Sequence, residues 1–368
     1  MAERTRPPFR ADHVGSLLRP KELTQAFRRR RAGEIDEATF AEVQDNAIRE
    51  AIRMQESVGL QSITDGEFRR ASYWSRFVER VQGLEVREAL FTFHDEHGHD
   101  QEFTAPHAGS KVSWAGPIAG DEFAFIHAHT ERTPKVTLPS PPSMHFWRLG
   151  AGVERTAYAD DGAYFTDLAS VYAAEIADLS DRGATYVQID DVPFAMLCDP
   201  KIRARVAKEG FDADTLIGDY IKLCNDALGG RPEGVTAAFH ICRGNYKGHF
   251  LSEGGYDDIA ERLFDELEVD AFFLEYDTPR AGDFAPLRFV PEGKIVVLGL
   301  VSSKSPEMER PDTLKRRIGE AAQHLPLDQL ALSPQCGFAS TVAGNPVTPE
   351  IQRAKLALVV ETAAAVWG

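Results

Sequence analysis

Short apolar runs recur along the chain, and stretches with apolar residues at helical spacing separate most of them. Eight runs have the length and composition of buried strands. They lie at residues 11–16, 61–67, 135–140, 184–191, 235–239, 270–277, 295–301 and 330–337. The helical patterns lie at residues 36–58, 164–182, 256–267, 311–323 and 349–366, with a further helix expected from about residue 21. This alternation predicts parallel strands joined by helices.

Eight strands, each followed by helical sequence, predict an α/β fold of the (β/α)8 TIM-barrel type. The chain has 368 residues, which exceeds the roughly 250 typical of that fold. Extra N-terminal helices and a β-hairpin insertion between the second and third strands, at about residues 88–120, account for the surplus. A histidine-rich turn at 94–99 is expected to form the polar tip of this hairpin.

No linker or internal repeat divides the sequence, so residues 1–368 are expected to form a single domain. A doubly wound open sheet is the main alternative fold. It usually carries a glycine-rich phosphate loop after a strand, and no such loop follows any of the eight runs.

The composition is that of an ordinary globular protein, with 43% hydrophobic and 27% charged residues. A formal net charge of -16 argues against nucleic acid or an acidic membrane surface as a partner. No apolar run reaches the roughly 18 residues of a membrane span, and the N-terminus has no apolar signal core. We therefore expect a cytoplasmic protein, monomeric or homo-oligomeric, that acts on small molecules.

His240 and Cys242 follow the fifth apolar run, two positions apart. In an extended chain such residues point to the same side. Neutral imidazole and thiolate are ligands that zinc prefers, so the pair is a candidate half of a metal site. A packed histidine beside an inert buried cysteine is the alternative that this spacing leaves open.

Further candidate ligands follow other strands. In a (β/α)8 barrel the carboxyl ends of the strands converge on one face, where catalysis takes place. Glu275 lies near the end of the sixth run and Cys336 near the end of the eighth. Together with His240 and Cys242 they form a set of four that suits tetrahedral zinc, the cofactor we predict. Cys198 and Cys224 lie on or beside predicted helices and are expected to be packed thiols.

Two thiolates and a carboxylate would leave a zinc centre with net negative charge, which makes it a poor activator of water. Such a centre is better suited to bind a substrate thiol, to lower its pKa from roughly 8.5 and to present a reactive thiolate. Glu275 would be the hardest and most exchangeable ligand. The mechanistic hypothesis is zinc-assisted alkyl transfer to a thiol.

The residues just described resemble a known family. Its motifs are found here as His240-x-Cys242, Glu275 in Phe-Phe-Leu-Glu-Tyr-Asp, Cys336 in Ser-Pro-Gln-Cys-Gly, His-Val-Gly-Ser at 13–16 and Gln-Ile-Asp at 188–190. Over nearly its whole length the chain resembles the catalytic barrel of cobalamin-independent methionine synthase, in a short single-barrel form. The resemblance implies an S-methyltransferase that makes methionine from homocysteine, with zinc held by His240, Cys242, Glu275 and Cys336.

The same resemblance implies that Val14, Gly15 and Ser16, together with Glu67 and Asp190, hold the homocysteine backbone. Two carboxylates would also pair with the ammonium group of an amino acid on physical grounds alone. Rim hydrogen bonding to loops is the structural alternative for both. Trp147, and less surely Phe146, is a candidate aromatic wall for a flat methyl donor such as a pterin; packing explains it equally well.

The chain departs from the family after the seventh strand, where Lys304 stands in place of a catalytic histidine. Lys304 and Asp190 are the residues we expect to take part in catalysis, although a lysine is a weaker general acid than imidazole at neutral pH. The half that helps hold a folate polyglutamate tail in full-length members is missing. The methyl donor therefore stays open between folate, a corrinoid and other compounds.

Three other functions stay open at this stage. One is alkyl transfer to another thiol such as coenzyme M, although its sulfonate would be repelled by Glu67 and Asp190. Another is a metal-free barrel like that of uroporphyrinogen decarboxylase. The third is a non-catalytic protein that stores zinc or binds thiols.

Overall fold

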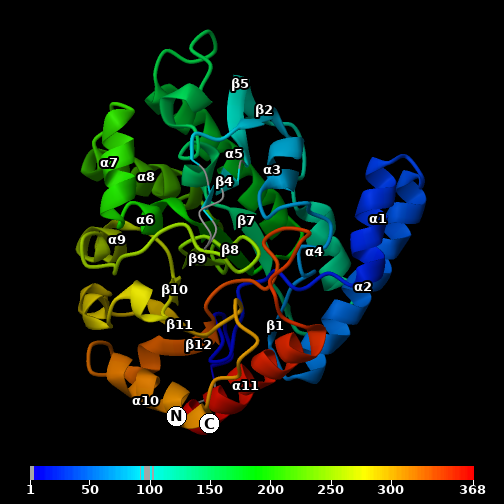
Figure 1. Cartoon of the computed structure of the whole chain (residues 1–368), viewed down its shortest axis with the longest axis vertical. Helices are drawn as coiled ribbons and strands as arrows, with labels where there is room; N and C mark the ends of the chain where they lie inside the picture. Colours follow the sequence, from blue (N-terminus) through cyan, green and yellow to red (C-terminus); the bar gives the residue numbers. More distant parts are fainter. Residues whose placement is uncertain (1–3, 92, 95–99, 102) are drawn as a thin grey trace.

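The computed structural model describes residues 4–91, 93–94, 100–101 and 103–368 (Figure 1). Most of the histidine-rich turn expected at 94–99 lies outside these described residues. None of the helices in the described part of the chain combines the length and the hydropathy that crossing a membrane requires.

Six parallel strands form one sheet through the middle of the molecule (Figure 1). In sheet order they are β7 (Val136–Pro139), β8 (Tyr186–Asp191), β9 (Thr236–Ile241), β10 (Ala271–Glu275), β11 (Ile295–Val301) and β12 (Leu330–Pro334). Nearly every residue of these strands is buried. Such continuous burial is expected of parallel strands that are covered on both faces. Six of the eight predicted strands are therefore confirmed.

The first two predicted strands are shorter than expected. β1 (Ser62–Ile63) pairs in parallel with β6 (Thr133–Pro134), which leads into β7. The first run makes a single bridge, Ala11 to Leu332 of β12. Gly15 has a φ of 139°, a conformation that ends an extended segment and favours glycine. Among the described residues, the strand pairings do not join into one closed ring.

Helices cover the sheet, and α1 and α2 form an outer pair along one side of the molecule (Figure 1). Their bounds are α1 (Lys21–Arg31), α2 (Glu37–Ser57), α3 (Ser75–Arg80), α4 (Gly120–His127), α5 (Asp161–Asp181), α6 (Pro193–Met196), α7 (Pro200–Lys208), α8 (Ala213–Leu228), α9 (Ala260–Glu266), α10 (Pro311–Ala321) and α11 (Pro349–Trp367). Side-chain N-caps fix several starts: Asp36 accepts from the backbone N–H of Thr39, and Thr348 accepts from that of Ile351.

The predicted hairpin insertion is present but begins earlier than residue 88. β2 (Val81–Glu88) pairs antiparallel with β5 (Thr104–Trp114), and β3 (Phe93–His94) pairs with β4 (Asp100–Gln101). Most of β2 faces solvent, and its sequence has charged residues between scattered apolar ones. The sequence therefore lacks the regular alternation of apolar and polar residues that would have predicted this strand.

Buried polar side chains connect the strands inside the sheet. The Lys135 ammonium group donates to Asp12 Oδ1 at 3.0 Å and to Gln188 Oε1 at 2.9 Å. The Asp12 carboxylate also accepts from the hydroxyls of Ser62, at 2.7 Å, and Tyr186, at 2.9 Å. Lys135 and Asp12 are both fully buried. These contacts hold the chain before β1 against β1, β8 and the start of β7.

Candidate metal and substrate site

Three potential metal ligands meet where the strands of the main sheet end. His240 lies on β9, Cys242 follows that strand directly, and Cys336 follows β12. One ligand atom from each of the three lies within 4.8 Å of the other two, and all three residues are buried. The His-x-Cys spacing thus places both side chains on one side, as the sequence predicted.

The chemistry of these side chains fits a metal ion. Both ring nitrogens of His240 are buried and have no nitrogen or oxygen partner among the described residues; the imidazole instead faces the Cys336 thiol. Buried polar atoms are nearly always hydrogen-bonded, so an imidazole that meets only sulfur is available to a metal ion. The Cys242 thiol, which hydrogen-bonds to Cys336, holds the pKa of Cys336 well below its usual range, and the His240 imidazole acts in the same direction. A thiolate is the form of cysteine that binds zinc.

Glu275, the fourth predicted ligand, has other partners in the structure. Its Oε2 accepts from the backbone N–H of Arg243 at 2.9 Å, and its Oε1 lies 3.4 Å from the Lys304 Nζ. The cluster of three described above does not include its carboxylate within the described chain. Among the described residues, the structure therefore does not bring the predicted fourth ligand into the cluster, and the Glu275 carboxylate contacts Arg243 and Lys304 instead.

A cavity of about 680 Å³ opens over the cluster of His240, Cys242 and Cys336. The predicted substrate residues that line it, beside the three cluster residues, are Val14, Ser16, Glu67, Trp147 and Asp190. Three predicted site residues, Gly15, Glu275 and Lys304, are not part of this lining as described. A Cβ on Gly15 would come within 2.7 Å of Thr137 Cγ2, so glycine allows close backbone packing there.

Glu67 has an unusual conformation and an unused oxygen. Its φ is 61°, the left-handed region that residues other than glycine rarely adopt. Its Oε1 accepts from the Thr137 hydroxyl at 2.8 Å, while its buried Oε2 has no hydrogen-bond partner in the part of the chain that the structure describes. Burial raises the pKa of Glu67. The free oxygen is therefore a candidate acceptor for a ligand's hydrogen bond.

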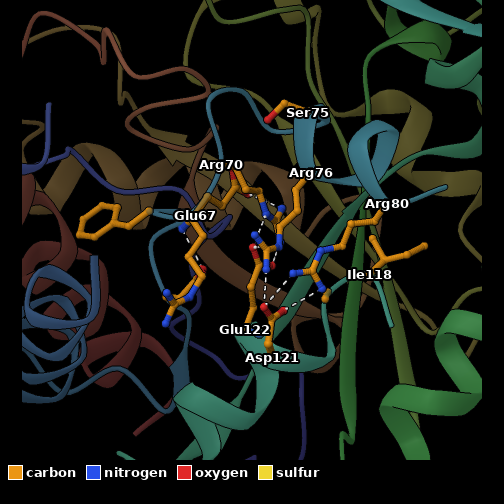
Figure 2. Close-up of polar contacts among 12 residues, drawn as sticks. Glu67, Arg70, Ser75, Arg76, Arg80, Ile118, Asp121 and Glu122 are labelled. Atoms are coloured by element: carbon orange, nitrogen blue, oxygen red, sulfur yellow. Dashed lines mark hydrogen bonds and ion pairs between the residues drawn. The ribbon is translucent and has the colours of Figure 1, made fainter. Parts of the chain in front are cut away.

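Arg70 lies near both Glu67 and Glu122, as Figure 2 shows. Its guanidinium lies 2.6 Å from Glu122 and 3.6 Å from Glu67. Arg76 also contacts Glu122, at 3.3 Å. The sequence analysis did not single out Arg70. Its partner Glu122 is 52 positions away, and no local pattern indicates that contact.

Asp190 lies on β8 and lines the same cavity. Its Oδ1 accepts from the Gln188 amide at 2.7 Å, and that amide also donates to the carbonyl of Val14 at 2.6 Å. Burial raises the pKa of Asp190 to about 7, against the opposing effect of the nearby His240. The backbone at Val14 and the carboxylate of Asp190 are thereby held in one hydrogen-bonded unit.

Aromatic side chains form part of the cavity wall. Trp147 lines it together with Tyr73 and Trp74, which the sequence analysis did not single out. Phe146 instead packs in the core, where its ring stacks on Phe91 with centroids 5.1 Å apart. Tyr73 and Trp74 follow the predicted second strand by only a few residues. Their position near a strand exit is the signal that could have identified them.

Comparisons with known proteins agree with this arrangement. A family model described as the catalytic domain of cobalamin-independent synthase matches residues 9–364. The chain is 40% identical to the uncharacterized protein YxjH of Bacillus subtilis over 364 residues, which cover 98% of this chain and 95% of that protein. It is 25% identical to a methionine synthase of Pyrococcus abyssi over 328 residues, covering 88% and 85% of the two chains.

A solved structure has the same overall fold. A Listeria monocytogenes protein, provisionally named vitamin-B12 independent methionine synthase, superposes with a TM-score of 0.77 and 32% sequence identity. The match covers 99% of this chain and 100% of that one. The likeness therefore extends over the sheet, its helices and the cavity region alike.

Proposed function

The chain belongs to the family of cobalamin-independent synthase catalytic domains, and we propose that it transfers a methyl group to the thiol of homocysteine, giving methionine. Family membership supports a methyltransferase of methionine biosynthesis. One observation carries the finer proposal: the cluster of His240, Cys242 and Cys336 lies in the same cavity as the carboxylates of Glu67 and Asp190. A metal-ligand cluster and an ammonium-binding pair together match an amino-acid thiol.

His240, Cys242 and Cys336 are the residues that would hold zinc. When bound, zinc would lower the pKa of a substrate thiol and so supply a thiolate nucleophile at neutral pH. The burial of all three side chains limits access of water to that nucleophile. Asp190 and Glu67 both line the cavity and would orient the amino-acid end of the substrate.

The ammonium group of homocysteine would find two acceptors. The free Oε2 of Glu67 is buried and needs a donor, because an unpaired buried acceptor costs free energy. Asp190, which lines the same cavity, supplies a second carboxylate. The same pair disfavours a sulfonate thiol such as coenzyme M. Trp147, Tyr73 and Trp74 would form the wall against which a flat methyl donor packs.

Replacing these carboxylates should weaken homocysteine binding selectively. We expect Glu67→Gln and Asp190→Asn each to raise the KM for homocysteine about 10- to 100-fold, the loss of one buried charged hydrogen bond. Zinc-loaded protein is first screened with methylfolate mono- and polyglutamates, methylcobalamin and S-methyl donors. The KM for homocysteine is then measured from methionine formation with a donor that is active.

The exposed carboxylate Glu292 offers a matched control, and Glu292→Gln should leave the KM unchanged. An unaltered KM for homocysteine in both cavity variants would remove the amino-acid assignment. Failure of every donor to give methionine would shift the proposal to another acceptor thiol.

We also propose that the strands close into a single-domain (β/α)8 barrel. The chain before β1 supports this, because it hydrogen-bonds on both sides. The Asp12 N–H donates to the Leu332 carbonyl of β12 at 3.0 Å. On the other side, the Thr64 hydroxyl donates to the Gly15 carbonyl at 2.7 Å, and the Leu17 N–H donates to the Gly66 carbonyl at 3.1 Å.

A further inference from the structure

Lys304 is a buried cation in contact with Glu275, the predicted fourth metal ligand. It follows β11, and its side chain is 8% exposed. Its Nζ donates to the Gly244 carbonyl at 3.0 Å and to Glu275 Oε1 at 3.4 Å. Gly244 follows Cys242 by two positions, and Lys304 is near enough to the cluster for the charges of Cys242 and Cys336 to act on it. The ammonium group is thus placed to act on Glu275.

The position of Lys304 does not suit direct proton transfer to a substrate in the main cavity. The lining of that cavity, as far as the structure describes it, contains all three cluster residues but not Lys304. Lys304 lines a separate cavity of about 700 Å³, together with Asp277 and Ser302. A role through Glu275 is therefore better supported than the general-acid role expected from the sequence.

Lys304 and a zinc ion would each bind the carboxylate of Glu275. The side chain is 1% exposed, and a buried carboxylate without a partner is strongly unfavourable. The Arg243 N–H holds Oε2 at 2.9 Å, which leaves Oε1 to Lys304 or to a metal ion. Binding zinc with this oxygen would weaken its contact with Lys304. The two interactions therefore compete.

We propose that Lys304 is a positioning residue that competes with zinc for Glu275, and so keeps a coordination position open to the substrate thiol. The proposal rests on the proposed function, since it assumes a zinc-bound thiol. Zinc prefers four ligands, and the cluster supplies three. When Glu275 pairs with Lys304, the fourth position is left for sulfur. Lys304 also offsets the negative charge that a bound thiolate adds to a buried site.

The test measures the binding of zinc and of homocysteine, and it does not depend on catalytic activity. Zinc affinity is determined by competition with a chromophoric chelator, and homocysteine affinity by calorimetry on zinc-saturated protein. For Lys304→Met we expect homocysteine to bind about 10-fold more weakly or worse, a change of about 1.4 kcal/mol, because its thiol must then displace the Glu275 carboxylate from zinc. Zinc should bind at least as tightly as in the wild type, because the freed carboxylate becomes a ligand.

Three further variants separate competition from a structural role. In Lys304→Met/Glu275→Gln the competing carboxylate is absent, so homocysteine affinity should return towards that of the wild type. Glu275→Gln alone should bind homocysteine no more weakly than the wild type, and this test does not depend on the folding of Lys304→Met. Lys304→Arg keeps the charge and should retain most of the affinity.

Three outcomes would overturn the role of Lys304: unchanged homocysteine affinity in Lys304→Met, an equal loss in the double variant, or weaker binding in Glu275→Gln. A wild-type protein that binds zinc and homocysteine separates these outcomes from failure of the proposed function. If the wild type bound neither, the proposed function would fall, and the role of Lys304 would fall with it.

Discussion

Cys336→Ala is expected to lose stoichiometric zinc and to make methionine at less than about one hundredth of the wild-type rate. Loss of an outer-shell partner alone costs about 10- to 100-fold, and Cys336 would be a direct ligand. The substitution leaves only His240 and Cys242 of the cluster. It also removes the side chain that reaches the site from the segment after β12, the edge strand of the main sheet, and meets His240 of β9 there.

The chain offers a matched control for this variant. Cys224 is also buried and free, but it lies on α8, outside the metal cluster of the described residues. Cys224→Ala should retain one zinc per chain and its activity. Zinc is measured by elemental analysis after dialysis, and methionine by chromatography. If Cys336→Ala kept both zinc and activity, the cluster would not be the metal site.

Asp12→Leu is expected to lower the free energy of unfolding by about 3–5 kcal/mol, because it leaves the Lys135 ammonium buried without its carboxylate. Lys135 and Asp12 are fully buried and lie 3.0 Å apart. The substitution also removes the acceptor of the Tyr186 and Ser62 hydroxyls. Urea denaturation followed by circular dichroism measures the loss.

The double variant Asp12→Leu/Lys135→Met supplies the comparison. Replacing a whole buried ion pair with apolar residues is often close to neutral, so much of the lost stability should return. Equal destabilisation in the single and double variants would show that the ion pair itself is unimportant. In that case the surrounding hydroxyls and the Gln188 amide would account for the effect.

Sequence patterns predicted the regular part of the fold well. The seventh run and β11 have the same bounds, 295–301, because a fully buried apolar strand between polar turns is unambiguous. The first two strands were overestimated. There the backbone is held mainly by side-chain bonds, such as that from the Thr64 hydroxyl to Gly15, which leave no periodic signal.

The convergence of three of the predicted ligand side chains has a geometric reason. Alternation along an extended chain brings His240 and Cys242 to one side, and convergence of parallel strand ends brings Cys336 to them. The predicted family is also confirmed. The pairing of Glu275 with Lys304, 29 positions later, and that of Arg70 with Glu122 were not predictable, because each depends on the packing of distant loops.

Proton release on homocysteine binding tests the central claim most directly. At neutral pH free homocysteine carries a protonated thiol, with a pKa of roughly 8.5. Zinc-loaded protein should therefore release about one proton for each homocysteine bound as thiolate. Calorimetry in buffers of different ionisation enthalpy measures this number, with methionine as the ligand that has no thiol proton to lose. Homocysteine binding without proton release, or no binding to the zinc-loaded protein, would contradict the account.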